Sequence, residues 1–160
     1  MKTAAALIPL VMLSACVTSG PPTPAGPSTG PGPYAAVQRP LPADENRIYI
    51  AAASPGRIVV RNDCVLFARL NGSVVLPVFE DGVVTGRDAR GPWLYDPASE
   101  EYFRDGTKVR VGGGGPGESI ATLSERVSLA QPVPARCLDG MTQDETHVLN
   151  PGIRYWDFDE

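Results

Sequence analysis

Three cysteines supply the most reactive side chains in this sequence, and Cys16 has the most informative surroundings. It follows a leucine, a serine and an alanine at the end of an apolar run over residues 4–13, and Lys2 precedes that run. A positive charge, a short apolar stretch and small residues before a cleavage point make up an export signal. The run is shorter than the roughly 20 apolar residues that a membrane-spanning helix needs. Residues 1–15 are therefore predicted to be a signal peptide that is removed before Cys16.

The residues Leu13, Ser14, Ala15 and Cys16 resemble the lipobox of bacterial lipoproteins. The resemblance implies that a diacylglyceryl group alkylates the thiol of Cys16, and that the new amine becomes a further site for a fatty acid such as palmitate. Two or three acyl chains on one residue hold a protein on a membrane. By the same resemblance, Val17 in place of an aspartate favours the outer membrane. We therefore expect a lipid-anchored protein of the bacterial cell envelope, at the periplasmic face of the outer membrane. An ordinary secretory signal with a chance cysteine is the alternative.

Residues 16–45 are expected to be the lipidated cysteine and a disordered tether. This stretch is dense in proline, glycine, serine and threonine, and its few bulky apolar side chains cannot offset the entropy lost on ordering. A proline-rich ligand for a groove on another protein is the alternative, because Pro21, Pro22 and Pro24 suit an extended geometry. Residues 46–160 are then expected to form one small β domain.

Cys64 and Cys137 remain once Cys16 is assigned to lipid. Two cysteines in an oxidising compartment most simply form a disulfide, worth about 4 kcal/mol for so long a loop. A redox-active or metal-binding pair is the alternative. The sequence offers it little support, because it has no Cys-x-x-Cys motif and a single histidine, His147.

Short β-branched runs bounded by turn residues predict strands over residues 57–61, 64–70 and 73–79. The dipeptide Asn71-Gly72 lies between the last two runs and favours a type I′ turn. These two strands are therefore expected to form a hairpin.

A second hairpin is predicted at Asp105-Gly106, which lies between residues 101–104 and 107–111. Residues 118–129 carry apolar side chains at helical spacing and predict one short helix. The whole pattern indicates a mainly β fold, either a small OB-like barrel or a curled antiparallel sheet with at most one short helix. An open sandwich is the alternative.

Four segments also resemble a small disulfide-bonded β-barrel domain that recurs in exported bacterial proteins and has no assigned reaction. They supply an early cysteine in a strand, a Pro-Val-Phe strand, an Asp-Gly turn with a glycine-rich loop, and a second cysteine, at residues 57–66, 76–82, 105–112 and 134–137. The resemblance implies a barrel and a disulfide, and it implies no catalytic residue. Residues 141–144 depart from the family, because they are polar where an apolar closing strand is expected.

The aromatic residues Trp93, Tyr95 and Tyr102 form the candidate partner surface. Exposed aromatic rings can stack on sugar rings or anchor another protein. Packing in the core of a small β domain is the alternative.

Patterns that would support catalysis or metal binding are weak. Ser119 and His147 could join an aspartate in a hydrolytic triad, but no Gly-x-Ser-x-Gly elbow presents the serine. The glycine run of residues 112–117 lacks the Gly-Lys-Ser/Thr of a phosphate loop. The acidic residues between 96 and 105 lack the spacing of a calcium loop. The sequence therefore assigns no catalytic residue, no cofactor and no metal ligand.

These observations favour a non-catalytic envelope module that binds or braces another envelope component, either a protein or cell-wall glycan. A hydrolase acting on glycan, peptide or ester bonds of the cell wall is the alternative. Nucleic acid is not expected as a partner. The formal net charge is −4, and the sequence has no cluster of basic residues that could bind along a phosphate backbone.

Overall fold

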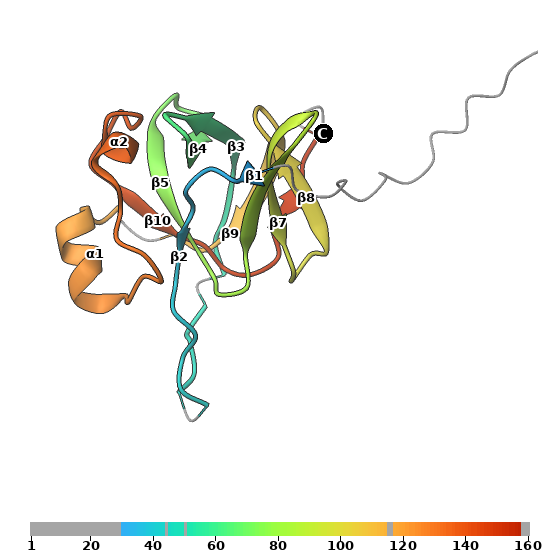
Figure 1. Cartoon of the computed structure of the whole chain (residues 1–160). Helices are drawn as coiled ribbons and strands as arrows, with labels where there is room; N and C mark the ends of the chain where they lie inside the picture. The colour runs from blue at the N-terminus through green and yellow to red at the C-terminus, as the bar shows by residue number, and fades with distance from the viewer. Residues whose placement is uncertain (1–29, 44, 50, 115–116, 158–160) are drawn as a thin grey trace, which may run out of the picture.

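The computed structural model describes residues 30–157 except 44, 50, 115 and 116 (Figure 1). The predicted signal peptide, the lipidation site Cys16 and the first part of the expected tether lie outside the described residues. Over the part that is described, no helix combines the length and the apolar character needed to span a bilayer.

The described chain is mainly β, as predicted, and its strands form two sheets. The larger sheet has the order β10-β5-β4-β3-β9-β11, with β2 also paired to β5. Its strands are β2 (Ala36–Val37), β3 (Ala53–Arg61), β4 (Cys64–Arg69), β5 (Val74–Phe79), β9 (Lys108–Gly112), β10 (Thr146–Val148) and β11 (Arg154–Tyr155). The smaller sheet has the order β1-β6-β7-β8, from β1 (Gly30–Pro31), β6 (Val84–Asp88), β7 (Gly91–Asp96) and β8 (Glu101–Arg104). Figure 1 shows the smaller sheet at one end of the molecule and the helices at the other.

Of the two expected forms, the structure has the curled sheet. The long strand β3 pairs with β4 through one half and with β9 through the other, which bends the sheet around it. A single bridge between Gly113 and Leu149 links the segments after β9 and β10, and no continuous ladder closes the described strands into a barrel. Most pairs in the curled sheet are antiparallel, but β2 and β10 both run parallel to β5. Parallel neighbours need long connections, and long segments of the chain separate β2 from β5 and β5 from β10.

The structure contains the predicted helix and one more. Helix α1 (Ile120–Arg126) lies within the expected segment, and Ser119 Oγ caps it by accepting from the backbone N–H of Thr122 at 3.2 Å. The one-turn helix α2 (Ala135–Leu138) exceeds the single helix that was expected. Four residues are too few to show a helical period, so pattern analysis cannot find such an element.

The hairpin at Asn71-Gly72 is confirmed, because β4 and β5 are antiparallel. The expected type I′ turn is wrong, because Gly72 has a positive φ, +84°, but Asn71 does not. The N–H of Arg69 donates to the carbonyl of Ser73, so the loop between the strands has three residues. The second predicted hairpin is wrong, because β8 belongs to the smaller sheet and β9 to the larger one. Asp105 Oδ1 accepts from the N–H of Val60 at 2.8 Å, and the N–H of Gly106 donates to the carbonyl of Ile58 at 2.8 Å. The turn is thus fastened to β3, and the chain changes sheets there.

Residues 34–38, which lie ahead of the predicted domain boundary at residue 46, pack against the larger sheet. Tyr34 and Ala36 are buried, and the backbone of Tyr34 pairs with Asp63 and Val65 at the start of β4. Strand β2 then adds to the far end of β5. Backbone hydrogen bonds hold this segment together with the buried side chain of Tyr34. Because the segment has few other large apolar side chains, its composition suggested a tether.

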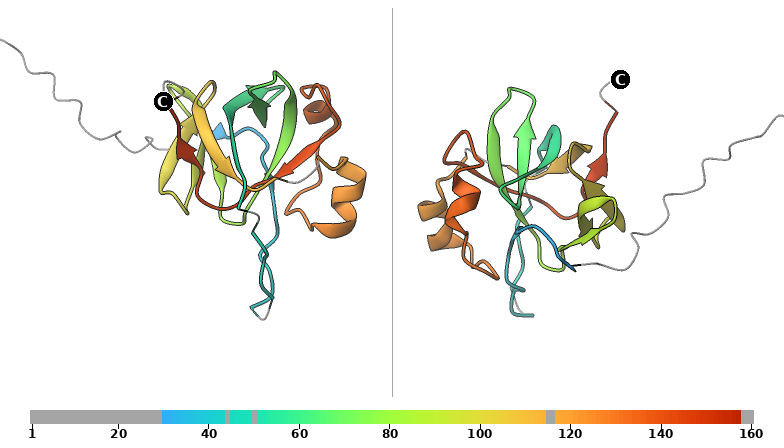
Figure 2. Two further views of the ribbon diagram at one scale, coloured as in Figure 1. Left: turned by 180° about the vertical axis from the view of Figure 1, so that it is seen from behind. Right: turned by 45° about the horizontal axis from the view of Figure 1, so that its top comes forward.

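The core has two parts, one on each face of the larger sheet. The part between the two sheets contains Phe67, Phe79, Leu94 and Phe103. The part beneath the helices contains Leu66, Leu76, Leu123, Cys64 and Cys137. In both views of Figure 2, the described residues between 39 and 49 project from the body as a narrow arm.

The predicted disulfide joins Cys64 to Cys137. The two Cα atoms are 5.5 Å apart, the separation in sequence is 73 residues, and both side chains are fully buried. The bond ties α2 to the first residue of β4.

Candidate functional site

The three predicted aromatic residues lie together on the outward face of the smaller sheet. Along β7, Leu94 and Asp96 point inward and are buried, so Trp93 and Tyr95 point outward. Tyr102 lies directly opposite Tyr95 on β8. We call Trp93, Tyr95 and Tyr102 the aromatic face.

The rings of the aromatic face contact one another. The ring centroids of Trp93 and Tyr102 are 5.4 Å apart in an edge-to-face arrangement, and those of Tyr95 and Tyr102 are 4.7 Å apart. Gly86 lies opposite Trp93 on β6, where a side chain would collide with the indole ring. All three rings are half-buried. The strand geometry therefore presents a continuous aromatic strip rather than three isolated side chains.

An ion pair borders the strip on one side. The guanidinium of Arg104 donates to both carboxylate oxygens of Asp88, at 3.0 and 2.6 Å, and to the carbonyl of Gly91 at 3.2 Å. These hydrogen bonds from Arg104 hold the pKa of Asp88 below its ordinary value. Val84, exposed by 49%, borders the strip on the other side, opposite Tyr95.

This arrangement is suited to binding rather than to bond cleavage. Aromatic rings offer flat apolar contact, and the neighbouring charged pair offers hydrogen bonds to hydroxyl or amide groups. No known protein family, curated protein or solved structure matches the chain. The candidate site therefore rests on the geometry of these residues.

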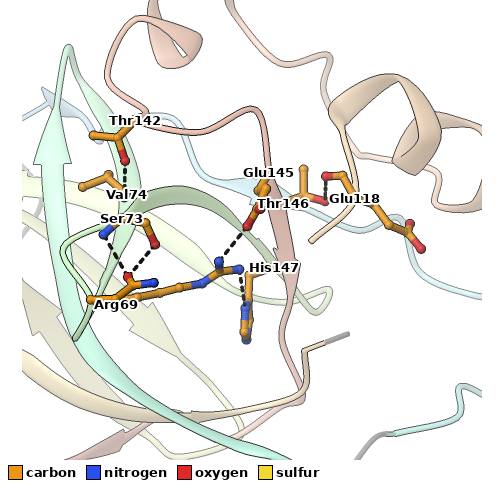
Figure 3. Close-up of polar contacts among 9 residues, drawn as sticks. Arg69, Ser73, Val74, Glu118, Thr142, Glu145, Thr146 and His147 are labelled. Carbon is orange, nitrogen blue, oxygen red and sulfur yellow. Dashed lines mark hydrogen bonds and ion pairs between the residues drawn. The ribbon is translucent and has the colours of Figure 1, made fainter. Parts of the chain in front are cut away.

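A partly buried polar cluster lies on the larger sheet, around the buried His147 of β10 (Figure 3). Arg69 donates to Glu145 Oε2 at 2.6 Å and to His147 Nδ1 at 3.4 Å. Burial, reinforced by the charge of Arg69, lowers the pKa of His147 to about 4, although Glu145 acts in the opposite direction. His147 is therefore a neutral, buried imidazole near pH 7.

Two glycines of the run, Gly114 and Gly117, pack closely against this cluster. Gly114 has a φ of +100°, and a Cβ atom there would lie 2.9 Å from His147 Cε1. A side chain at Gly117 would collide with the carboxylate of Glu145. These two glycines permit close approach to a polar cluster, which gives them a structural role in place of the anion-binding role weighed from the sequence.

The structure does not assemble Ser119 and His147 into a hydrolytic site. Ser119 Oγ caps α1 and lies 3.0 Å from Thr122 Oγ1, whereas His147 contacts Arg69 and the ring of Phe67. Within the described residues, no hydrogen bond joins Ser119 to His147. Among the residues that the structure describes, neither side chain has the partners that a nucleophile and its base require.

The acidic residues near the second turn also serve structural roles. Buried Asp96 accepts from the N–H groups of Gly152 and Ile153 at 3.1 and 2.7 Å, which holds the C-terminal segment against the smaller sheet. Asp105 accepts from Val60. Among the residues that the structure places, no group of three His, Cys, Asp or Glu side chains is arranged to hold a metal ion.

Sequence reasoning missed a cavity of about 610 Å³ between the arm and the end of α1. Two ion pairs lie in its wall: Arg47 with Glu80, and Arg126 with Glu118 at 2.5 Å. The exposed apolar side chains Leu41, Ile48 and Tyr49 also line it. No local motif could have revealed this cavity, because its walls come from segments spread between residues 38 and 150.

Proposed function

We propose that the protein is a lipid-anchored, non-catalytic module of the bacterial cell envelope, and that its aromatic face binds or braces another envelope component. The observation that carries this proposal is the contact of three half-buried rings, from two strands, on the outward side of the smaller sheet. Such clusters of tryptophan and tyrosine supply much of the binding energy at protein interfaces and at sugar-binding sites.

The roles of the polar side chains support a binding function over a hydrolytic one. The side chains weighed as catalytic are a helix cap, Ser119, and a buried imidazole with a low pKa, His147. Retention of cellular function by a His147→Gln variant is the expected result. Complete loss of function in a correctly folded variant would favour the hydrolase.

Photocrosslinking in intact cells tests the aromatic face. A photoreactive amino acid at Val84 leaves the three rings in place and lies opposite Tyr95. We expect a discrete adduct with an envelope component, identified by mass spectrometry, and we expect Trp93→Ala to abolish it. The matched control carries the photoreactive residue at exposed Glu125 on α1. The same adducts from both positions, or none from Val84, would contradict the proposal.

Fatty-acid labelling tests the anchor separately. The parent chain is expected to incorporate labelled palmitate, and the Cys16→Ser variant is expected to incorporate none. Absence of label in the parent would reject lipidation while leaving the crosslinking result unaffected.

A further inference from the structure

Four basic residues share one face of the larger sheet. On β9, Val109 and Val111 are buried in the core, so Lys108 and Arg110 point to the opposite side. Residues opposite each other in a ladder point the same way, which adds two more cations, Arg57 opposite Lys108 and Arg154 opposite Arg110. We call Arg57, Lys108, Arg110 and Arg154 the basic face.

The helices do not cover the basic face. They pack over β4 and β5, and the view from behind in Figure 2 shows β9 and β11 on the side away from α1. Arg57, Arg110 and Arg154 are exposed, and Lys108 is half-buried. Within the described residues, the side chains of Arg110 and Arg154 make no hydrogen bond or ion pair.

The pairing of like charges points to an anionic partner. Like charges directly opposite in a ladder destabilise a sheet, and Arg110 lies directly opposite Arg154. The excess of positive charge is local to this face, because the whole chain carries a formal net charge of −4. The sequence did not reveal the basic face, since the fold gathers its members from three distant strands.

A tryptophan adjoins these cations. The N–H of Trp156 donates to the carbonyl of Lys108 at 3.2 Å, which continues the ladder one residue beyond β11. The register therefore places Trp156 opposite Lys108, on the same face. Tryptophan beside lysine and arginine is typical of surfaces that meet lipid headgroups, because the indole ring favours the boundary between water and hydrocarbon.

We propose that the basic face binds anionic phospholipid headgroups, so that β3, β9 and β11 lie against a membrane surface. The four cations are spread across three neighbouring strands instead of converging on one point, which suits a flat array of phosphates better than a single bound anion. Because a contact of this kind depends on charge, it weakens as salt shortens the range of the electrostatic field. The inference goes beyond the proposed function, since it requires neither lipid on Cys16 nor the aromatic face.

Vesicle co-sedimentation of the full chain carrying Cys16→Ser tests this contact. Vesicles of phosphatidylcholine alone measure any binding by the apolar residues 4–13, and vesicles that also contain phosphatidylglycerol add the anionic charge. We expect stronger binding to the anionic vesicles, which high salt abolishes. Arg110→Glu combined with Arg154→Glu is expected to weaken that binding at least about 20-fold.

A matched control makes the same change in net charge elsewhere. Arg90 and Arg136 are exposed cations outside the basic face, and Arg90→Glu combined with Arg136→Glu is expected to leave binding within about twofold of the parent. Circular dichroism verifies that both double variants are folded.

Several outcomes would overturn the proposal. They are equal losses in the two double variants, equal binding to both kinds of vesicle, displacement by inorganic phosphate at constant ionic strength, and equal binding to duplex DNA. A negative vesicle result together with a specific crosslink from Val84 would reject the lipid contact and retain the proposed function.

Discussion

The guanidinium of Arg69 donates to Nδ1 of His147 at 3.4 Å, although 78 residues separate the two in sequence. A guanidinium can only donate, so Nδ1 is the acceptor and the proton of the neutral imidazole is on Nε2. That Nε2 is buried and has no acceptor among the described residues. A second proton on this ring would lie beside the positive charge of Arg69 in a buried site, so protonation of His147 disfavours the folded state.

We expect the protein to lose stability as the pH falls from about 6.5 to about 4. Burial and Arg69 lower the pKa of His147 to about 4, whereas an unfolded histidine titrates near 6.5. In that window the unfolded chain binds a proton that the folded chain does not, so the free energy of unfolding decreases by up to about 3 kcal/mol. The contribution is fully present above pH 6.5. Urea unfolding at a series of pH values measures it.

The control for this effect is His147→Gln, which cannot titrate. Its free energy of unfolding is expected to change less between pH 6.5 and 4 than that of the parent, whatever its stability at pH 7. Parallel curves for the two proteins would assign the acid sensitivity to other groups.

Removing the disulfide is expected to lower the free energy of unfolding by about 4 kcal/mol, because the bond closes a long loop in the unfolded chain. The Cys64→Ala, Cys137→Ala double variant tests this by guanidinium denaturation. A reducing agent should destabilise the parent by a similar amount and leave the double variant unchanged. Equal sensitivity of both proteins to the reductant would show that the effect lies elsewhere.

Gly86→Ala is expected to destabilise the smaller sheet by about 1–3 kcal/mol, because the added methyl group collides with the ring of Trp93. The same change in a Trp93→Ala background should cost much less. Thermal unfolding of the parent, the two single variants and the double variant gives the coupling free energy between residues 86 and 93. Additive effects would mean that Trp93 does not lie over Gly86.

Asp96→Ala is expected to release the C-terminal segment, because its carboxylate accepts from two backbone N–H groups, at Gly152 and Ile153. Leaving buried donors without an acceptor costs about 1–3 kcal/mol each. Hydrogen exchange at the amide of Ile153 should accelerate strongly in this variant. Exposed Asp139 supplies the control, and Asp139→Ala should leave that exchange rate unchanged. Slow exchange at Ile153 in both variants would contradict the role of Asp96 in holding the C-terminal segment.

Local signals in the sequence predicted the features that depend on short stretches of chain. The hairpin at Asn71-Gly72 follows from a dipeptide typical of turns, in which Gly72 takes the positive φ. The disulfide follows from the number of cysteines and the expected compartment. Trp93 and Tyr95 are two residues apart in a strand, so their shared face follows from the strand period.

The features that escaped prediction depend on contacts between distant segments. Asp105-Gly106 has the composition of a hairpin turn, yet hydrogen bonds to β3 make it a crossing between sheets. The His147 cluster needs Arg69 and Glu145, which no spacing rule connects. The basic face needs the register of three strands, and register is set by the whole packed sheet.

The insertion of Tyr34 and Ala36 into the core has a mechanical consequence. Strand β2 is short and runs parallel to the fully buried strand β5. It follows β1 in the sequence and lies close to the N-terminal end of the described residues. A force applied to the chain ahead of Gly30 is therefore transmitted through β1 and β2 into the interior, because the residues that connect the two strands, 32–35, are themselves packed against the domain. Tension on the N-terminal side would reach the hydrophobic centre of the molecule directly.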